Sequence, residues 1–361
     1  MALPTGLSVL FSLLACITPE VVGGADSGVL APDTGATDTT VAFTDCSTLS
    51  WYEGDVRLQQ QSDVDGFCST HNAISGDLSI DVSNNDDTIT ELDGIGCLCV
   101  VEGDLLLTSD GETDDPSAPP PPHITGDLEL SLLQRIGGDF SLINLPLLTY
   151  LQELWSLEEV GGDILIDGCP ELQYSSLYTL KTVGGSITLR NLGKLLVFRL
   201  PSLSSAQSIR LGSTGDSESL YFLAELALTS LTRLTGDLSL TGTRNLGLLS
   251  APVLTDIDGA LHIEAACSLR PSLPVLTALG SLHIEGACGI SDFTGVPALT
   301  TLTGTDDAGY SFWLSASEAV EDKEIEDFLG ALSVPPLGAI FTDTSTTCAD
   351  VLFAYGETFC E

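Results

Sequence analysis

A five-residue unit recurs along most of the chain and limits the folds that the chain can adopt. The unit reads Gly, usually Asp, an apolar residue, any residue, and a second apolar residue. A degenerate copy, SIRL, begins at Ser208, with Gln207 in the place of the glycine. The regular copies begin at Gly54, Gly76, Gly103, Gly126, Gly138, Gly162, Gly185, Gly236, Gly259 and Gly280. Most successive copies lie about 22 to 24 residues apart, and a fixed period of this length is typical of a solenoid.

Each unit also shows the alternation of a short β-strand. In GDLSI, Leu78 and Ile80 would point to one side and Ser79 to the other, because successive side chains of a strand alternate. Copies stacked in register would form a parallel sheet that hides its Leu, Ile and Val residues on one side. The sequence therefore predicts a mainly β protein, a right-handed parallel β-helix with repeats of about 22–24 residues and capped ends.

The glycine and the aspartate of the unit have predicted roles in the turn before the strand. Glycine permits a positive φ in such a turn, and an Asp side chain can accept hydrogen bonds from backbone amides of the same turn. Ca²⁺ binding is the alternative role for these carboxylates, but the glycine-rich nonapeptide of calcium-binding β-rolls is absent. We therefore expect turn formation from the aspartates of the copies, which are Asp55, Asp77, Asp104, Asp127, Asp139, Asp163 and Asp237.

The segments between the strands carry a resemblance to a known family. Segments such as LWSLEEVGG and LYTLKTVGG place a Leu and a second apolar residue before the next glycine. Together with the Gly-Asp unit, this pattern resembles the receptor L domain family over about residues 46–305. That family includes the ligand-binding lobes of insulin- and EGF-type receptors and fungal cell-wall proteins, so the resemblance implies a β-helical fold more than a particular function. A leucine-rich repeat solenoid is the alternative fold, but no copy has the Asn of that consensus in register.

The array has two irregularities and two ends that need covering. Only 12 residues separate Gly126 from Gly138, so one of these copies is expected on another face. The insert at residues 109–123, with four consecutive prolines, is expected to project as a loop.

An open solenoid exposes its core at both ends. We expect a C-terminal helix over residues 315–332, with a capping box of Ser315 and Glu318 and with apolar positions at Ala319, Ile325, Phe328 and Leu329.

Ten cysteines indicate an oxidising compartment. The pairs Cys46–Cys68 and Cys348–Cys360 are predicted to close the N-terminal and C-terminal caps. Cys267 and Cys288 occupy matching places in consecutive repeats, where they could form a disulfide or a pair of buried thiols. If Cys16 is modified, an odd number remains and at least one cysteine stays unpaired. The full set of disulfide candidates is Cys46, Cys68, Cys97, Cys99, Cys267, Cys288, Cys348 and Cys360.

The N-terminal residues predict export. Residues 1–16 read as a signal peptide that ends in a lipobox, LLAC, with Cys16 as the lipidated residue. The leader has no basic residue before its apolar run, so an ordinary signal peptide stays open. Residues 17–45 form a predicted Asp/Thr/Gly linker, residues 46–313 the solenoid, and residues 314–361 a C-terminal helix and disulfide cap. We expect a lipoprotein of the cell envelope, at the outer-membrane surface or in the periplasm, or else a secreted protein.

The charge of the chain narrows the choice of partners. It contains 51 acidic and 11 basic residues, a formal charge of −40. Such a field repels nucleic acid and anionic membranes and favours basic partners, so membrane contact is expected only through an N-terminal lipid. Signatures of metalloproteases, serine hydrolases, nucleotide-binding loops and C-x-x-C redox sites are all absent. We therefore expect no cofactor and no enzymatic activity.

Two repeats carry the sharpest candidate site. His262 and Glu264 lie in ALHIE, and His283 and Glu285 occupy the same places in SLHIE. Adjacent strands would place the two imidazoles within about 5 Å of each other. Such a set could bind Zn²⁺, but two neighbouring strands give a flat ligand set that suits tetrahedral zinc poorly, so a duplicated polar patch is the simpler interpretation.

The predicted function is binding of a protein or glycan ligand by the outward side chains of the strands. The alternatives are a structural envelope protein without a specific ligand and, less favoured, a carbohydrate-active β-helix enzyme. The residues expected to contact a ligand are Arg57, Glu129, Arg190, Arg210, His262, Glu264, His283 and Glu285.

Overall fold

The computed structural model confirms a β-solenoid. It describes residues 43–82, 89–109, 126–151, 154–213, 220–317 and 319–343. The signal peptide, Cys16, nearly all of the linker, Cys348 and Cys360, and most of the insert at residues 109–123 lie outside these ranges. Among the described residues, 21 strands form one sheet and seven form a second. Each full rung contributes a short strand and a long strand to the first sheet and one strand to the second, and the strands of successive rungs pair in parallel.

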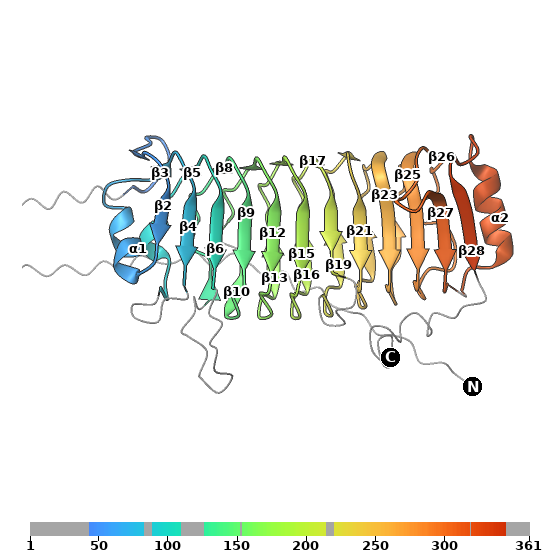
Figure 1. The fold of residues 1–361 in the computed structure, drawn as a ribbon, viewed down its shortest axis with the longest axis horizontal. Helices are drawn as coiled ribbons and strands as arrows, with labels where there is room; N and C mark the ends of the chain where they lie inside the picture. Colours follow the sequence, from blue (N-terminus) through green and yellow to red (C-terminus); the bar gives the residue numbers. More distant parts are fainter. Residues whose placement is uncertain are drawn as a thin grey trace, which may run out of the picture. The chain divides into compact units, whose positions relative to one another are not determined.

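The long strands of the first sheet carry the Gly-Asp units and run side by side from the blue to the red end of Figure 1. They are β2 (Val56–Leu58), β4 (Leu78–Asp81), β6 (Leu105–Thr108), β9 (Phe140–Ile143), β12 (Ile164–Asp167), β15 (Ile187–Arg190), β18 (Ile209–Leu211), β21 (Leu238–Thr241), the C-terminal halves of β23 (Asp256–Glu264) and β25 (Ala278–Glu285), β27 (Tyr310–Ser315) and β28 (Ala339–Asp343).

The short strands of the same sheet precede the long ones in each rung. They are β1 (Trp51–Tyr52), β3 (Ala73–Ile74), β5 (Val100–Val101), β8 (Arg135–Ile136), β11 (Glu159–Val160), β14 (Thr182–Val183), β17 (Ser205–Ala206), β20 (Arg233–Leu234), the N-terminal halves of β23 and β25, and β26 (Thr301–Leu302). The second sheet consists of β7 (Gly126–Asp127), β10 (Leu148–Tyr150), β13 (Tyr174–Ser176), β16 (Val197–Arg199), β19 (Glu225–Ala227), β22 (Leu248–Ser250) and β24 (Arg270–Ser272). Gly126 therefore does lie on another face, as the 12-residue step predicted.

The core is a stack of aliphatic layers between the two sheets. In β12, Ile164 and Ile166 are buried, and Leu165 between them is only half-buried. The residues aligned with Ile166 in the neighbouring rungs, Leu142 and Leu189, are fully buried as well. The predicted alternation thus holds, and each rung closes its interior against the rungs on both sides.

The aspartates of the units form a ladder from rung to rung, which corrects the predicted turn role. The Oδ1 atom of Asp139 accepts the backbone N–H of Asp163 in the next rung at 2.7 Å, and Asp104 accepts that of Asp139 at 2.8 Å. The same bond joins Asp55 to Asp77, Asp77 to Asp104, Asp163 to Ser186 and Asp237 to Ala260. The carboxylates therefore link neighbouring rungs, because the stacking brings each one under the first amide of the next strand.

The glycines of the units are needed for close approach and not for a positive φ. Of the strand-leading glycines described, only Gly54 has a positive φ, of 99°. A Cβ atom on Gly162 would instead overlap the carboxylate of Asp139 and lie 2.9 Å from the carbonyl carbon of Gly138. The prediction of a left-handed turn at each unit was therefore wrong, since the steric limit comes from the preceding rung.

Helices lie at both ends of the stack (Figure 1). At the N-terminal end, α1 (Gln61–Phe67) buries Val64 and Phe67, and a 3-10 turn, η1 (Asp93–Ile95), follows β4. At the C-terminal end, α2 (Asp322–Ala331) buries Ile325 and Phe328.

The predicted C-terminal helix was too long and its capping box was wrong. Ser315 ends β27, and Glu318 lies outside the described residues. The residue that precedes α2 is Glu321, which makes no side-chain cap hydrogen bond. Val320 is buried in place of Ala319, whereas Leu329 packs against the core as predicted.

Disulfides hold the N-terminal end with a connectivity that differs from the predicted Cys46–Cys68 pair. Cys46 bonds to Cys99, and Cys68 bonds to Cys97. Both bonds link the first rung to the C-x-C segment below it, so the stacking and not the sequence order decides the partners. Cys267 and Cys288 are each disulfide-bonded, which excludes the buried-thiol alternative.

Cys169 is a free cysteine, and burial raises the pKa of its thiol to about 12. It is a core residue of its rung. In the described part of the chain, no helix is long and apolar enough to cross a membrane.

Candidate functional site

The outward side of the long strands presents two parallel rows of side chains. The first row contains the middle residue of each unit, as in Arg210, Ser239 and His262, which are paired across β18, β21 and β23. The second row lies two residues further along each strand and includes Glu264 and Glu285. Both rows lie on the outer side of the sheet because the alternating positions fill the core, although Thr108, Thr241 and Ser315 of the second row are buried.

The first row ends in a ladder of stacked rings at the C-terminal end. The imidazoles of His262 and His283 are nearly parallel, with their centroids 4.4 Å apart. Trp313 stacks on His283 at 5.4 Å, and Phe341 stacks on Trp313 at 4.0 Å. Tyr310 packs edge-on against Trp313 at 4.8 Å. Strict register over four strands therefore converts separate outward residues into one rigid surface.

Carboxylates of the second row hold the two imidazoles. His262 Nε2 lies 3.2 Å from Glu264, and His283 Nε2 lies 3.4 Å from Glu285. The other ring nitrogen of His283, Nδ1, lies 3.5 Å from Asp306. The four side chains of the predicted patch thus lie together on two neighbouring strands. Within the described ranges, however, no group of three or more His, Cys, Asp or Glu side chains converges as a metal site would require.

An open cleft of about 250 Å³ lies beside the ladder. Its walls are Arg210, Asp237, His262 and the loop segment that contains Asp306 and Asp307. Ser239, the small residue that precedes His262 in the row, leaves one side of the imidazole open to the cleft. Asp306 is held in place, because its Oδ1 atom accepts the N–H groups of Ala308 and Tyr310, whereas Asp307 is exposed.

Most basic side chains of the protein are paired with acidic side chains. Arg210 contacts Asp237 at 3.2 Å, and Arg190 contacts Asp167 at 2.7 Å. All eleven basic residues lie in the described ranges, and nine of them form ion pairs: Arg57, Arg135, Lys181, Arg190, Lys194, Arg199, Arg210, Arg233 and Lys323. Most basic side chains are therefore already engaged by carboxylates of the chain itself.

The remaining predicted ligand residues do not join the cluster. Arg57 lies on β2, at the opposite end of the first row. Arg190 is in the second row, paired across rungs with Asp167. Glu129 lies between β7 and β8 and so belongs to a different face from the long strands, which corrects its grouping with them. The Gly126 unit lies within the long rung that joins β6 to β9, and these two strands pair directly, so this unit is not part of the long-strand register.

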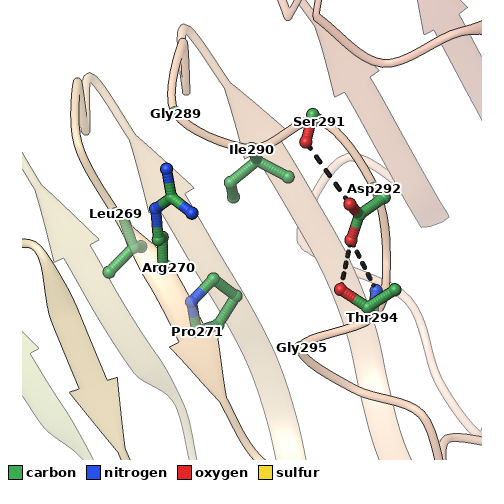
Figure 2. Close-up of a pocket in the computed structure, with 9 residues that line it drawn as sticks. All are labelled: Leu269, Arg270, Pro271, Gly289, Ile290, Ser291, Asp292, Thr294 and Gly295. Atoms are coloured by element: carbon green, nitrogen blue, oxygen red, sulfur yellow. Dashed lines mark hydrogen bonds between the residues drawn. The ribbon is translucent and has the colours of Figure 1, made fainter. Parts of the chain in front are cut away.

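A second hollow, of about 150 Å³, lies at the edge of the second sheet (Figure 2). It is formed by β24 and by the loop of residues 289–295 that follows β25. Asp292 accepts hydrogen bonds from the hydroxyl and the backbone N–H of Thr294 and from Ser291. The bonds from Thr294, helped by the charge of Arg270, lower the pKa of Asp292. Its carboxylate is thus already satisfied within the loop, and we assign this hollow to loop structure.

Sequence reasoning missed Trp313 and Phe341. Neither strand begins with the Gly-Asp unit, so the repeat search ended before them. The available signal was the alternation in SFWLS, where Phe312 and Leu314 are buried and Trp313 between them is not. The pairing of β25 with β27 aligns Trp313 with His283.

Comparison with models of known protein families and with curated proteins yields no match. The fold and the site thus define a class only: a parallel β-helix that presents an acidic outer face with a stacked-ring ladder. The function has to be argued from that surface.

Proposed function

We propose that the protein is an exported, non-catalytic binding protein that recognises a basic segment of another protein on the outward side of its long strands. The observation that carries this proposal is the cleft beside His262. It combines one open side of an imidazole ring with three carboxylates and one guanidinium.

The charges of the cleft favour a cationic side chain. Arg210 is already bound to Asp237, so Asp306 and Asp307 supply the remaining negative charge. A ligand arginine or lysine would place its charged end at Asp307 and lay its apolar stem along the ring of His262. The formal charge of −40 would also speed the approach of a basic partner.

A surface that the fold holds rigid suits ligand binding better than catalysis. The ring ladder, the ion pairs and the aspartate ladder fix the surface before any ligand arrives, and a preorganised surface loses less entropy on binding. The disulfides agree with an extracellular or exported protein. Anchoring through Cys16 and kinship with receptor L domains remain parts of the proposal that rest on the sequence alone.

The test uses a fluorescent octapeptide of arginine and a matched glutamate octapeptide. We expect the arginine peptide to bind and the glutamate peptide not to bind. Asp307→Asn and His262→Ala should each weaken binding about fivefold, which corresponds to about 1 kcal/mol.

Asp93→Asn is the matched control, because it removes one exposed charge near α1, at the other end of the stack. It should change the Kd by less than about twofold, as expected for a distant screened charge. If Asp93→Asn weakens binding as much as Asp307→Asn, the peptide binds diffusely and the proposed site is wrong.

A further inference from the structure

A separate hollow lies at the corner where the long strands turn toward the second sheet. It measures about 440 Å³ and is lined by Pro170, Gly193, Tyr221 and Phe222, with Glu171 and Lys194 at its side. These residues belong to three consecutive rungs, because Tyr174, Val197 and Glu225 are paired across β13, β16 and β19. Pro170, Gly193 and Tyr221 each lie four residues before those positions and therefore form a column.

The middle rung leaves this column open because it contributes a glycine. Pro170 and Tyr221 are two rung steps apart, which is about 10 Å. Two van der Waals contacts take up about 8 Å of that separation. The space that remains between Pro170 and Tyr221 suits a ring that is thicker than a flat aromatic ring, such as a sugar in its chair form.

The aromatic wall of the hollow is fixed from behind. The guanidinium of Arg244, in the next rung, lies 4.9 Å from the centroid of the Tyr221 ring. Phe222 packs edge-on against Tyr221 at 4.7 Å, and Asn245 donates to the backbone oxygen of Tyr221 at 2.7 Å. One face of the tyrosine is thereby covered, and the face toward Gly193 is left to the hollow.

The side of the hollow offers both a hydrogen-bond donor, Lys194, and a hydrogen-bond acceptor, Glu171. Lys194 Nζ contacts the two carboxylate oxygens of Glu171 at 2.7 and 2.6 Å. The pair is partly exposed, so adjacent hydroxyl groups can bond to it. Stacking against an aromatic ring combined with a charged pair at the edge suits a polyol ring better than an aliphatic side chain.

Further aromatic residues continue from this corner across the second sheet. Tyr174 lies in the same rung as Pro170 and stacks on Tyr150 at 6.2 Å. Trp155 and Tyr178, at the far corner of neighbouring rungs, are 55% and 53% exposed. Among the described residues, four of the six exposed large aromatic side chains lie on these consecutive rungs: Trp155, Tyr174, Tyr178 and Phe222.

We propose that the hollow binds one pyranose unit of a neutral glycan, whose chain continues over Tyr174 and Tyr178. The net charge of −40 disfavours uronate or sulfated chains. This site lies on a different face from the cleft beside His262, so the two functions can fail independently.

The test measures binding of four neutral hexasaccharides, of β-1,4-linked glucose, N-acetylglucosamine, mannose and xylose, and of hexagalacturonate by calorimetry on the intact chain. At least one neutral probe should bind, and hexagalacturonate should not. Gly193→Leu fills the hollow and should abolish the heat of binding, and Phe222→Ala should weaken binding about tenfold.

Tyr52→Ala is the matched control, because Tyr52 is an exposed aromatic at the other end of the stack, 40% accessible. It should leave the Kd within about twofold. Circular dichroism confirms that Gly193→Leu is folded, and Phe222→Ala serves if it is not. Absence of binding by every neutral probe, stronger binding of hexagalacturonate, or binding unaffected by both substitutions overturns the proposal.

Discussion

The aspartate ladder makes a prediction about coupling between a carboxylate and the glycine of the next rung. Asp139 accepts the N–H of Asp163 at 2.7 Å, and a Cβ atom on Gly162 would overlap the same carboxylate. We expect the effects of Asp139→Ala and Gly162→Ala on the free energy of unfolding to be non-additive.

The magnitudes follow from the contacts. A hydrogen bond to a charged group contributes about 1.5–3 kcal/mol, and Asp139 is exposed, so water partly replaces it and Asp139→Ala should destabilise by about 1–1.5 kcal/mol. Gly162→Ala should destabilise by about 2–3 kcal/mol, in the range of overpacking. Without the carboxylate the added methyl group still meets the backbone of the preceding rung, at Gly138 C (2.9 Å) and Asp139 N (3.0 Å). The double variant should therefore be about 1 kcal/mol more stable than the sum of the single effects implies.

Urea unfolding followed by circular dichroism gives the three free energies. Hydrogen exchange of peptides from residues 154–213 provides a local readout, because each rung contacts only its neighbours. Gly330→Ala is the control, since nothing lies within 4 Å of a Cβ atom built there; in α2 it should be neutral or stabilise by up to about 1 kcal/mol. If Gly162→Ala has the same effect with and without Asp139, the carboxylate is not what demands a glycine, and the reasoning fails.

Three further predictions concern the stability of the folded chain. Cys68→Ser with Cys97→Ser should lower stability by about 3–4 kcal/mol, from the loop of 29 residues that the bond closes, and melting under non-reducing conditions checks this; an unchanged melting temperature would mean that the N-terminal end is held without the bond. Ile166→Ala should destabilise by about 2–5 kcal/mol, whereas the outward Leu165→Ala should have a smaller effect, and equal effects in urea unfolding would contradict the assignment of inner and outer sides. The pKa of Asp292 is lowered in the folded chain by its bonds from Thr294, so its stabilising contribution is complete above its ordinary value of 3.8 and lost as the pH falls through the folded value. Asp292→Asn should therefore lower the melting temperature at pH 7 and have little effect at pH 2, and an equal loss at both pH values would exclude the ionised carboxylate as the cause.

Sequence alone predicted the alternation within a rung and the proximity of matching positions in consecutive repeats. Alternation within GDLSI was enough to assign Leu78 and Ile80 to the core and Ser79 to the outside. His262 and His283 occupy matching positions in consecutive repeats, which placed them side by side, because strands paired in parallel register bring matching positions next to each other.

Contacts between rungs that the repeat pattern does not mark escaped it. The reason for Gly162 is a carboxylate 23 residues earlier in the chain, which no local rule of turn geometry includes. The partners of Cys46 and Cys68 depend on which segments stack at the N-terminal end. Trp313 lacks the repeat signature, so its place on the ladder became visible only with the strand pairing. The hollow over Gly193 likewise requires three rungs at once.

The aspartate ladder has a consequence for how such a chain can change in length. A rung whose unit carries the Asp offers a carboxylate to the next rung and an amide to the one before it, so such rungs can join one another in any order. Duplication of one complete Asp-bearing unit would keep its junctions satisfied, whereas gain or loss of part of a unit would break two. The ALHIE and SLHIE units lack that Asp and still pair in register, and growth by whole units lengthens a binding face without redesigning its interior.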